Sequence, residues 1–115
     1  MRDGAQQGAL DLDLLARQTL GDRELEAELF VLFEAQLDRL MSVVAGDGDR
    51  TTRAEAAHSL KGASSAIGAA EVMRLAGELE LAFGTDGPEP ASLLSGLVAA
   101  VADARVAIAS WAQDA

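Results

Sequence analysis

Apolar side chains recur at intervals of three and four residues along most of the sequence, and this spacing marks one face of an α-helix. The breaks in the pattern are short: residues 46–49 and 84–90 combine Gly with Asp or Pro, and Gly68 stands alone. Short connections between amphipathic helices make consecutive helices antiparallel. The sequence therefore predicts an all-α fold, an antiparallel up-down four-helix bundle. The expected helices cover about residues 22–45, 50–67, 69–83 and 90–112.

The apolar residues of these helices identify the expected core. The stripe of the first long helix consists of Leu25, Leu29, Leu32, Phe33, Gln36, Leu37, Leu40, Met41 and Val44, of which Gln36 is the one polar member. Val31 lies off this stripe, so we expect it to be exposed. The third helix contributes Val72, Met73, Leu75, Ala76, Leu79, Ala82 and Phe83, and the fourth contributes Leu94, Leu97, Val98, Val101, Ala104, Ile108 and Trp111.

Capping residues set the expected helix ends. Asp22 is a good N-cap for the first long helix, and Asp49 or Thr51 can cap the second. Gly68 suits the position just after the last turn of that second helix, where glycine is favoured.

The N-terminal part of the chain has a weaker pattern. Four leucines between residues 10 and 15 predict a short additional N-terminal helix over about 11–18, docked on the main body. Residues 1–9 are polar and rich in Gly, Ala and Gln, so we expect a flexible N-terminus. The length of 115 residues and the single set of helices predict one bundle domain over 10–115.

Composition narrows both fold and function. Three Phe, one Trp and no Tyr are few aromatic residues for a strand-rich fold, whereas Ala, Leu, Glu and Arg favour helices. Nine basic and 19 acidic side chains leave a net charge of −10, which argues against nucleic acid and anionic membranes as partners. One histidine and no cysteine argue against a zinc site or a disulfide framework.

The sequence contains no pattern typical of export or membrane insertion. Residues 1–4 are followed by polar residues rather than by the apolar segment of a signal peptide. No apolar run is expected to span a bilayer, because Asp103 and Arg105 interrupt the one at 97–102. We therefore expect a cytoplasmic protein without a membrane partner.

The only histidine lies in the middle of the second long helix. At about 100° per residue, His58, Lys61, Gly62 and Ser65 share one side of that helix, and none of them is a large apolar residue. The sequence therefore predicts a helix that presents a histidine with open space around it and buries the opposite face. That opposite face carries Ala56, Leu60, Ala63 and Ile67.

This stripe has the groups that phosphoryl transfer to histidine needs. Imidazole is nucleophilic near neutral pH, so one ring nitrogen of His58 can attack phosphorus while the other needs a hydrogen-bond partner. Lys61, one turn away, can approach the transferred phosphoryl oxygens. Gly62 costs a helix interior about 1 kcal/mol relative to Ala, and close approach of another protein's backbone would explain that cost. Ser65 is small and can donate a hydrogen bond.

The segment Ala57-His58-Ser59-Leu60-Lys61-Gly62-Ala63-Ser64, followed by Gly68-Ala69 and Leu79-Glu80, resembles the histidine phosphotransfer (HPt) domain family of two-component phosphorelays. The resemblance covers roughly residues 10–112. It implies a four-helix bundle whose phosphoacceptor, here His58, is exposed in mid-helix. The family's lysine and glycine correspond to Lys61 and Gly62. The resemblance further assigns Glu80, on the next helix, as partner of the second ring nitrogen.

The resemblance implies partners rather than cofactors. The expected partners are response-regulator receiver domains, whose aspartate exchanges a phosphoryl group with histidine, and a hybrid histidine kinase of a bacterial signalling pathway. The Mg²⁺ of that reaction belongs to the receiver, and we expect the chain to be a monomer with no cofactor or metal of its own. No Gly-rich ATP-binding segment is present, so the chain would be a phosphorelay intermediate, a phosphoprotein, rather than an autonomous kinase. We expect Arg50, Arg53, Lys61 and Arg74 to offset the acidic charge near the docking face.

Two other functions stay open. One is a non-catalytic HPt-like adaptor that binds a receiver or kinase without chemistry, although Lys61 and Gly62 beside the histidine argue against it. The other is the phosphoacceptor domain of a chemotaxis-type histidine kinase, which would normally be a far longer chain. The start at Met1 favours a free-standing protein, with an excised domain as the alternative.

Overall fold

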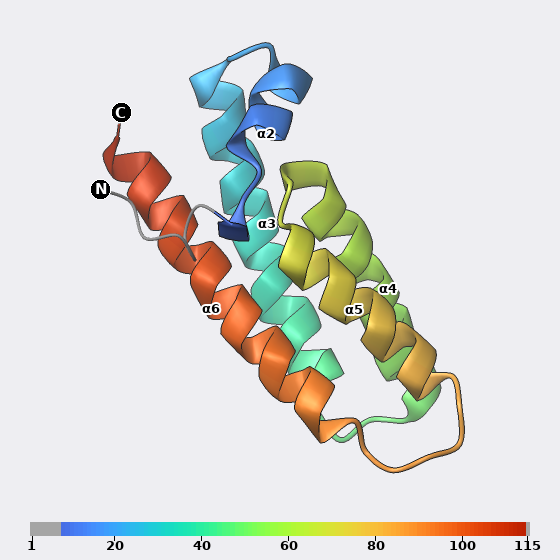
Figure 1. Cartoon of the computed structure of the whole chain (residues 1–115). Helices are drawn as coiled ribbons and strands as arrows, with labels where there is room; N and C mark the ends of the chain where they lie inside the picture. The colour runs from blue at the N-terminus through green and yellow to red at the C-terminus, as the bar shows by residue number, and fades with distance from the viewer. Residues whose placement is uncertain (1–7, 115) are drawn as a thin grey trace.

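The computed structural model describes residues 8–114 and shows a bundle of helices whose axes lie nearly along one direction (Figure 1). The four long helices alternate in direction, and each packs against the next one along the chain, most extensively α4 against α5. The expected all-α, antiparallel up-down bundle with a short additional helix is confirmed. The helices are α2 (Leu12–Thr19), α3 (Arg23–Val44), α4 (Arg50–Ile67), α5 (Ala70–Phe83) and α6 (Ala91–Gln113).

Aspartate side chains begin the helices that carry and support the histidine. The Asp22 carboxylate accepts a hydrogen bond from the backbone N–H of Leu25 at 3.2 Å, and Asp49 accepts one from Thr52 at 2.8 Å. Each of these bonds satisfies one of the N–H groups that a helix leaves free in its first turn. Asp49 rather than Thr51 is therefore the cap of α4.

Gly68 ends α4 for two reasons. Its φ of 76° lies in the left-handed region that favours glycine. In addition, a Cβ at this position would lie 2.9 Å from the backbone oxygen of Asp11. The N–H of Asp11 donates to the Gly68 carbonyl at 2.8 Å, so the segment before α2 is joined to the end of α4.

The core differs from the expected one along one side of α3. Leu32 is 62% exposed and Leu25 is 39% exposed, so the prediction that both are core residues was wrong, whereas Val31 is exposed as predicted. Phe30 is buried instead and packs edge-on against Trp111 of α6, with the ring centroids 4.8 Å apart. The buried stripe of α3 is therefore rotated towards α6, and it consists of Glu26, Phe30, Phe33, Leu37, Leu40 and Val44.

The same kind of correction applies to α6. Val98 is 54% exposed, although it was expected in the core, and its neighbour Leu97 is completely buried. By length and composition alone, α6 is also apolar enough to cross a membrane, with a mean hydropathy of 1.6. The expectation that no apolar segment is long enough to span a bilayer was therefore wrong. A helix that packs in the core of a bundle also meets these criteria of length and hydropathy. Here the apolar residues of α6 pack in the bundle at Leu97, Val101, Ala104, Ile108 and Trp111.

The short helix α2 covers one end of α3. Leu15 is buried, and the Thr19 hydroxyl lies 2.6 Å from Oε2 of Glu26, which is itself buried on α3. Ala9 and Leu10 are buried as well, so the packed body already includes residues that precede α2. The flexible N-terminus was expected over residues 1–9, and residues 1–7 of that range lie outside the described part of the chain.

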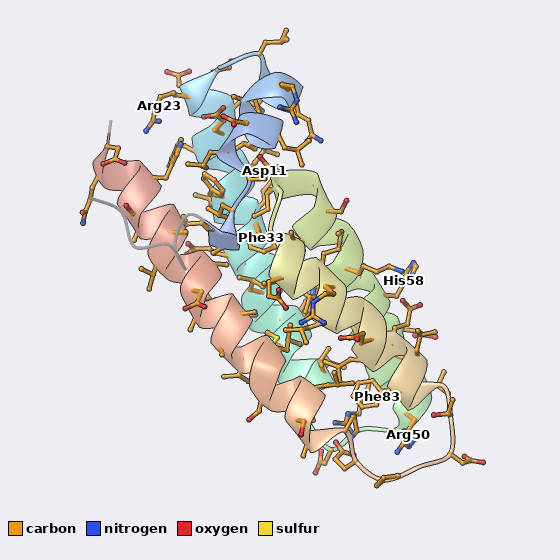
Figure 2. All side chains as sticks on the ribbon, in the orientation of Figure 1. Asp11, Arg23, Phe33, Arg50, His58 and Phe83 are labelled. Carbon is orange, nitrogen blue, oxygen red and sulfur yellow. The ribbon has the colours of Figure 1, made fainter. Side chains whose placement is uncertain are left out.

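Arg50 and Arg53 hold together the opposite end of the bundle, where Figure 2 labels Arg50 and Phe83. The Arg53 guanidinium donates to the Val44 carbonyl at 3.1 Å, binds the Glu89 carboxylate with both terminal nitrogens, and lies over the Phe83 ring. Arg53 is buried, so its expected role in offsetting surface charge was wrong.

Arg50 has a similar structural role in the loop between α5 and α6. Its guanidinium donates to the carbonyls of Ala82 at 3.0 Å, Thr85 at 3.1 Å and Pro88 at 3.3 Å. Because backbone oxygens occupy these donors, Arg50 holds the loop in place. Arg74 lies between Glu71 and Glu78 on its own helix, so its charge is also paired.

Candidate functional site

His58 projects from the middle of α4 to the outside of the bundle (Figure 2). Its side chain is 65% exposed, and its ring is therefore accessible to another molecule. Two residues close to it in the same helix have the opposite environment, since Ala57 and Leu60 are completely buried on the other face. The predicted division of α4 into a buried face and a histidine face is thus what the structure shows.

Glu80 of α5 is the side chain that contacts the imidazole. Its Oε2 lies 3.0 Å from Nδ1 of His58, across the interface between the two helices. An ionised carboxylate only accepts hydrogen bonds, so a neutral imidazole in this contact carries its proton on Nδ1. Nε2 is then left with a free lone pair. The resemblance-based pairing of Glu80 with the second ring nitrogen agrees with this geometry.

Lys61 contacts the same carboxylate. Its Nζ lies 3.4 Å from Oε1 of Glu80, whereas His58 uses Oε2. The Glu80 side chain is 30% exposed and the Lys61 side chain 43% exposed, so water reaches both groups and weakens their attraction. The structure therefore brings three of the predicted site residues into one cluster: His58, Lys61 and Glu80.

Gly62 has open space where a side chain would be. A Cβ at this position would meet no atom within 4 Å, so packing within the chain does not explain why glycine is present. Ser59, Gly62, Ser65 and Ala66 are all exposed on α4, and we refer to them as the small-residue platform. Ser65 belongs to this platform but lies about two helical turns from His58 and does not join the Glu80 cluster.

The platform extends to an apolar edge of α3. Leu32 lines a shallow surface groove together with Ala63 and Ala66 of α4. Val31, which is 70% exposed, lines the next depression along α3, again with Leu32. Sequence analysis missed Leu32 because its spacing fits the core stripe as well as the exposed edge.

A groove of about 830 Å³ also borders His58, and it adjoins the platform at Ser59. It runs between the first half of α4, the end of α5 and the following loop, and its acidic side chains are Glu55, Glu80 and Asp86. Arg50 also lines it, with its guanidinium bound to loop carbonyls. The surface beside the histidine is therefore negative along this groove and apolar or small on the platform.

We also searched residues 8–114 for side chains that could bind a metal ion together. No group of three or more His, Cys, Asp or Glu side chains in this range has an arrangement that could hold a metal ion.

Comparison with models of protein families identifies the family to which this helical bundle belongs. The family model of the Hpt domain matches residues 23–107, from the start of α3 into α6, and so includes the whole His58 cluster. The chain belongs to the Hpt domain family. Searches of curated proteins and of solved structures gave no significant match.

Membership of this family implies a general activity. Hpt domains carry phosphoryl groups on a histidine in two-component systems and interact there with receiver domains and kinases. In this Hpt domain the only histidine is His58, which is also the residue that α4 exposes.

Proposed function

We propose that this Hpt domain relays a phosphoryl group between receiver-domain aspartates through His58. The observation that carries the proposal is the 3.0 Å contact between Nδ1 of His58 and Glu80, on a ring that is otherwise exposed. A carboxylate at Nδ1 holds the ring in one orientation and one tautomer. The nitrogen directed to a partner is then Nε2, which is the nucleophile.

The transfer step follows from this arrangement. The Nε2 lone pair attacks the phosphorus of an aspartyl phosphate, an N–P bond forms, and the P–O bond to the aspartate breaks. The bonding electrons leave with the receiver's carboxylate. The proton on Nδ1 stays between the ring and Glu80, so the positive charge that develops on the imidazole faces a carboxylate. The reverse sequence returns the phosphoryl group to a second receiver.

Lys61 is the cation available for the phosphoryl oxygens. Its ammonium group is bound to Glu80 and lies one helical turn from His58, so a modest rotation of its flexible side chain would bring it to the phosphoryl group. The Mg²⁺ that assists such transfers would be bound by the receiver domain. A receiver would dock on the small-residue platform and the apolar edge formed by Val31 and Leu32, where Gly62 leaves space for its backbone.

The remaining parts of the proposal concern context. We propose a hybrid histidine kinase as the upstream source, a cytoplasmic location and a monomeric state. The net charge of −10 supports a protein rather than a nucleic acid as partner.

The test is phosphotransfer from a phosphorylated receiver domain to the wild-type chain and to His58→Gln. Wild-type protein should take up acid-labile, base-stable label, and the variant should take up none. Label that persists in His58→Gln would place the acceptor elsewhere. A chain that binds receivers but takes up no label would be a non-catalytic adaptor, and labelling only by an ATP-dependent kinase domain would indicate a chemotaxis-type phosphoacceptor.

A further inference from the structure

Gly77 is a glycine in the middle of α5 that neither a turn nor a helix end explains. It lies within the helical range Ala70–Phe83, well away from both ends, and is half-buried. A glycine in a helix interior costs about 1 kcal/mol relative to alanine. A feature of the surrounding structure should therefore account for it.

The side chain of Lys61 occupies the space next to Gly77. A Cβ at position 77 would lie 3.3 Å from Cδ of Lys61, which is closer than an ordinary van der Waals contact. Gly77 and Glu80 are three residues apart and so lie on the same face of α5. The stem of Lys61 thus crosses from α4 over Gly77, and its ammonium group ends 3.4 Å from Oε1 of Glu80.

The two glycines of the site therefore differ. A Cβ at Gly62 would meet no atom within 4 Å, whereas a Cβ at Gly77 would meet the stem of Lys61. Gly62 leaves space for a partner, and Gly77 leaves space for a residue of the site itself. A larger residue at 77 would move the Lys61 stem away from α5 and take its ammonium group off Glu80.

We propose that Gly77 is a positioning residue of the phosphotransfer site, because its missing side chain lets Lys61 lie on α5 and reach the carboxylate that also holds His58. This inference rests on the proposed function of His58. Gly77 acts through Lys61 and touches no reacting atom. Before transfer, Lys61 is held on Glu80, within one helical turn of the ring that receives the phosphoryl group.

A double-mutant cycle tests this proposal with phosphoramidate, a small phosphodonor that needs no docking surface. The nucleophile displaces ammonia from this donor, so the labelling rate reports on the chemistry at His58. Gly77→Leu should slow labelling by about fivefold, the factor expected for loss of one exposed ionic interaction, and Gly77→Ala by less. In the Lys61→Met background, Gly77→Leu should have no further effect.

Two controls separate positioning from simple changes in helix stability. Gly96→Ala in α6 places a Cβ 3.5 Å from Leu75, an ordinary contact, and should stabilise its helix without changing the labelling rate. Circular dichroism establishes that each variant is folded. Equal slowing by Gly77→Leu with lysine or methionine at position 61, or no slowing in either background, would overturn the proposal.

The position of Lys61 can be measured independently of phosphorylation. Nuclear Overhauser contacts between the Lys61 methylenes and the Gly77 Hα atoms are expected in the wild-type chain. Their absence would overturn the Gly77 proposal whatever the labelling shows. If the contacts are present but His58 takes up no label from phosphoramidate or from a receiver, then the proposed function of His58 fails while the placement of Lys61 by Gly77 stands.

Discussion

Glu80 on α5 and His58 on α4 meet through a single contact of 3.0 Å between Oε2 and Nδ1. The two residues are 22 positions apart in the sequence, and the antiparallel packing of their helices brings them together. The same carboxylate binds Lys61 through its other oxygen. Glu80 therefore links His58 to Lys61, and its replacement should affect both side chains.

Replacement of Glu80 tests how the ring is oriented. Glu80→Gln keeps an oxygen that accepts the Nδ1 proton but removes the charge, whereas Glu80→Ala removes both. We expect labelling of His58 by phosphoramidate to be slower in Glu80→Gln, by about fivefold, and slower still in Glu80→Ala. Nitrogen-15 NMR of the ring should show more of the Nε2-protonated tautomer in Glu80→Ala. Identical rates and tautomer populations in all three proteins would exclude this role.

Gly62 gives a prediction in which stability and function change in opposite directions. Gly62→Ala should raise the free energy of unfolding by up to about 1 kcal/mol, because alanine favours a helix interior and the new Cβ meets no atom within 4 Å. Transfer from a phosphorylated receiver should nevertheless be slower, and Gly62→Gln should slow it sharply while helicity is kept. The measurements are urea denaturation and receiver-to-chain transfer rates.

Gly96→Ala is the matched control for this prediction, since it replaces a helical glycine away from His58. It should not slow receiver transfer. Fast transfer in Gly62→Gln would mean that no partner backbone approaches this part of α4.

The sequence was most informative for α4, where the capping residues and most of the candidate site residues lie in one helix. Asp49 and Gly68 mark the two ends of α4, and the predicted range of about 50–67 matches Arg50–Ile67. His58, Lys61 and Gly62 are spaced within four residues, so helical periodicity alone places them on one face. Glu80 came from the family resemblance, because periodicity within α5 does not reveal which side chain of α4 it faces.

The buried face of α3 shows why the rest could not be predicted. Leu25, Leu29 and Leu32 follow a helical spacing, and so do Phe30, Phe33 and Leu37, so two overlapping stripes fit the same sequence. The choice between them depends on where α6 and α2 pack. Trp111 and Thr19 belong to those helices, and their contacts with Phe30 and Glu26 decide the rotation of α3. The role proposed for Gly77 likewise rests on a contact between two helices, α4 and α5.

The ion pair between Arg53 and Glu89 predicts a loss of stability in acid. The hydrogen bond from Arg53 holds the pKa of the Glu89 carboxyl below its ordinary value of 4.5. A carboxyl whose pKa is lower in the folded state contributes stability above the pKa of the unfolded chain, and this contribution disappears as the pH falls through the lowered value. Urea denaturation from about pH 6 downward should therefore show stability decreasing below about pH 4.5.

Glu89→Gln removes the titrating group and should reduce this pH dependence, while the variant is less stable than wild type near pH 6. The comparison is made as a difference between the two proteins at each pH, because other carboxylates titrate in the same range. A difference that stays constant from about pH 6 to pH 3 would contradict the lowered pKa of Glu89.

Val31 and Leu32 offer the most direct test of where a receiver docks. Both side chains are more than half exposed, at 70% and 62%, so Val31→Ser and Leu32→Ser should change the free energy of unfolding by no more than about 0.5 kcal/mol. If these residues form the apolar edge of the docking surface, each change should weaken binding of a receiver, because it removes apolar area from the interface. Labelling by phosphoramidate depends on His58 and its two charged neighbours and should be affected far less.

Val98→Ser is the matched control, because Val98 is 54% exposed on α6 and lies on a helix that does not carry the histidine. Isothermal titration of a receiver domain into each variant measures the effect. Weaker binding in Val31→Ser and Leu32→Ser together with unchanged binding in Val98→Ser would place the receiver on the α3 side of His58. Equal weakening in all three variants would indicate a general effect of lost surface hydrophobicity. Unchanged binding in the α3 variants would favour the acidic groove lined by Glu55, Glu80 and Asp86 as the docking surface.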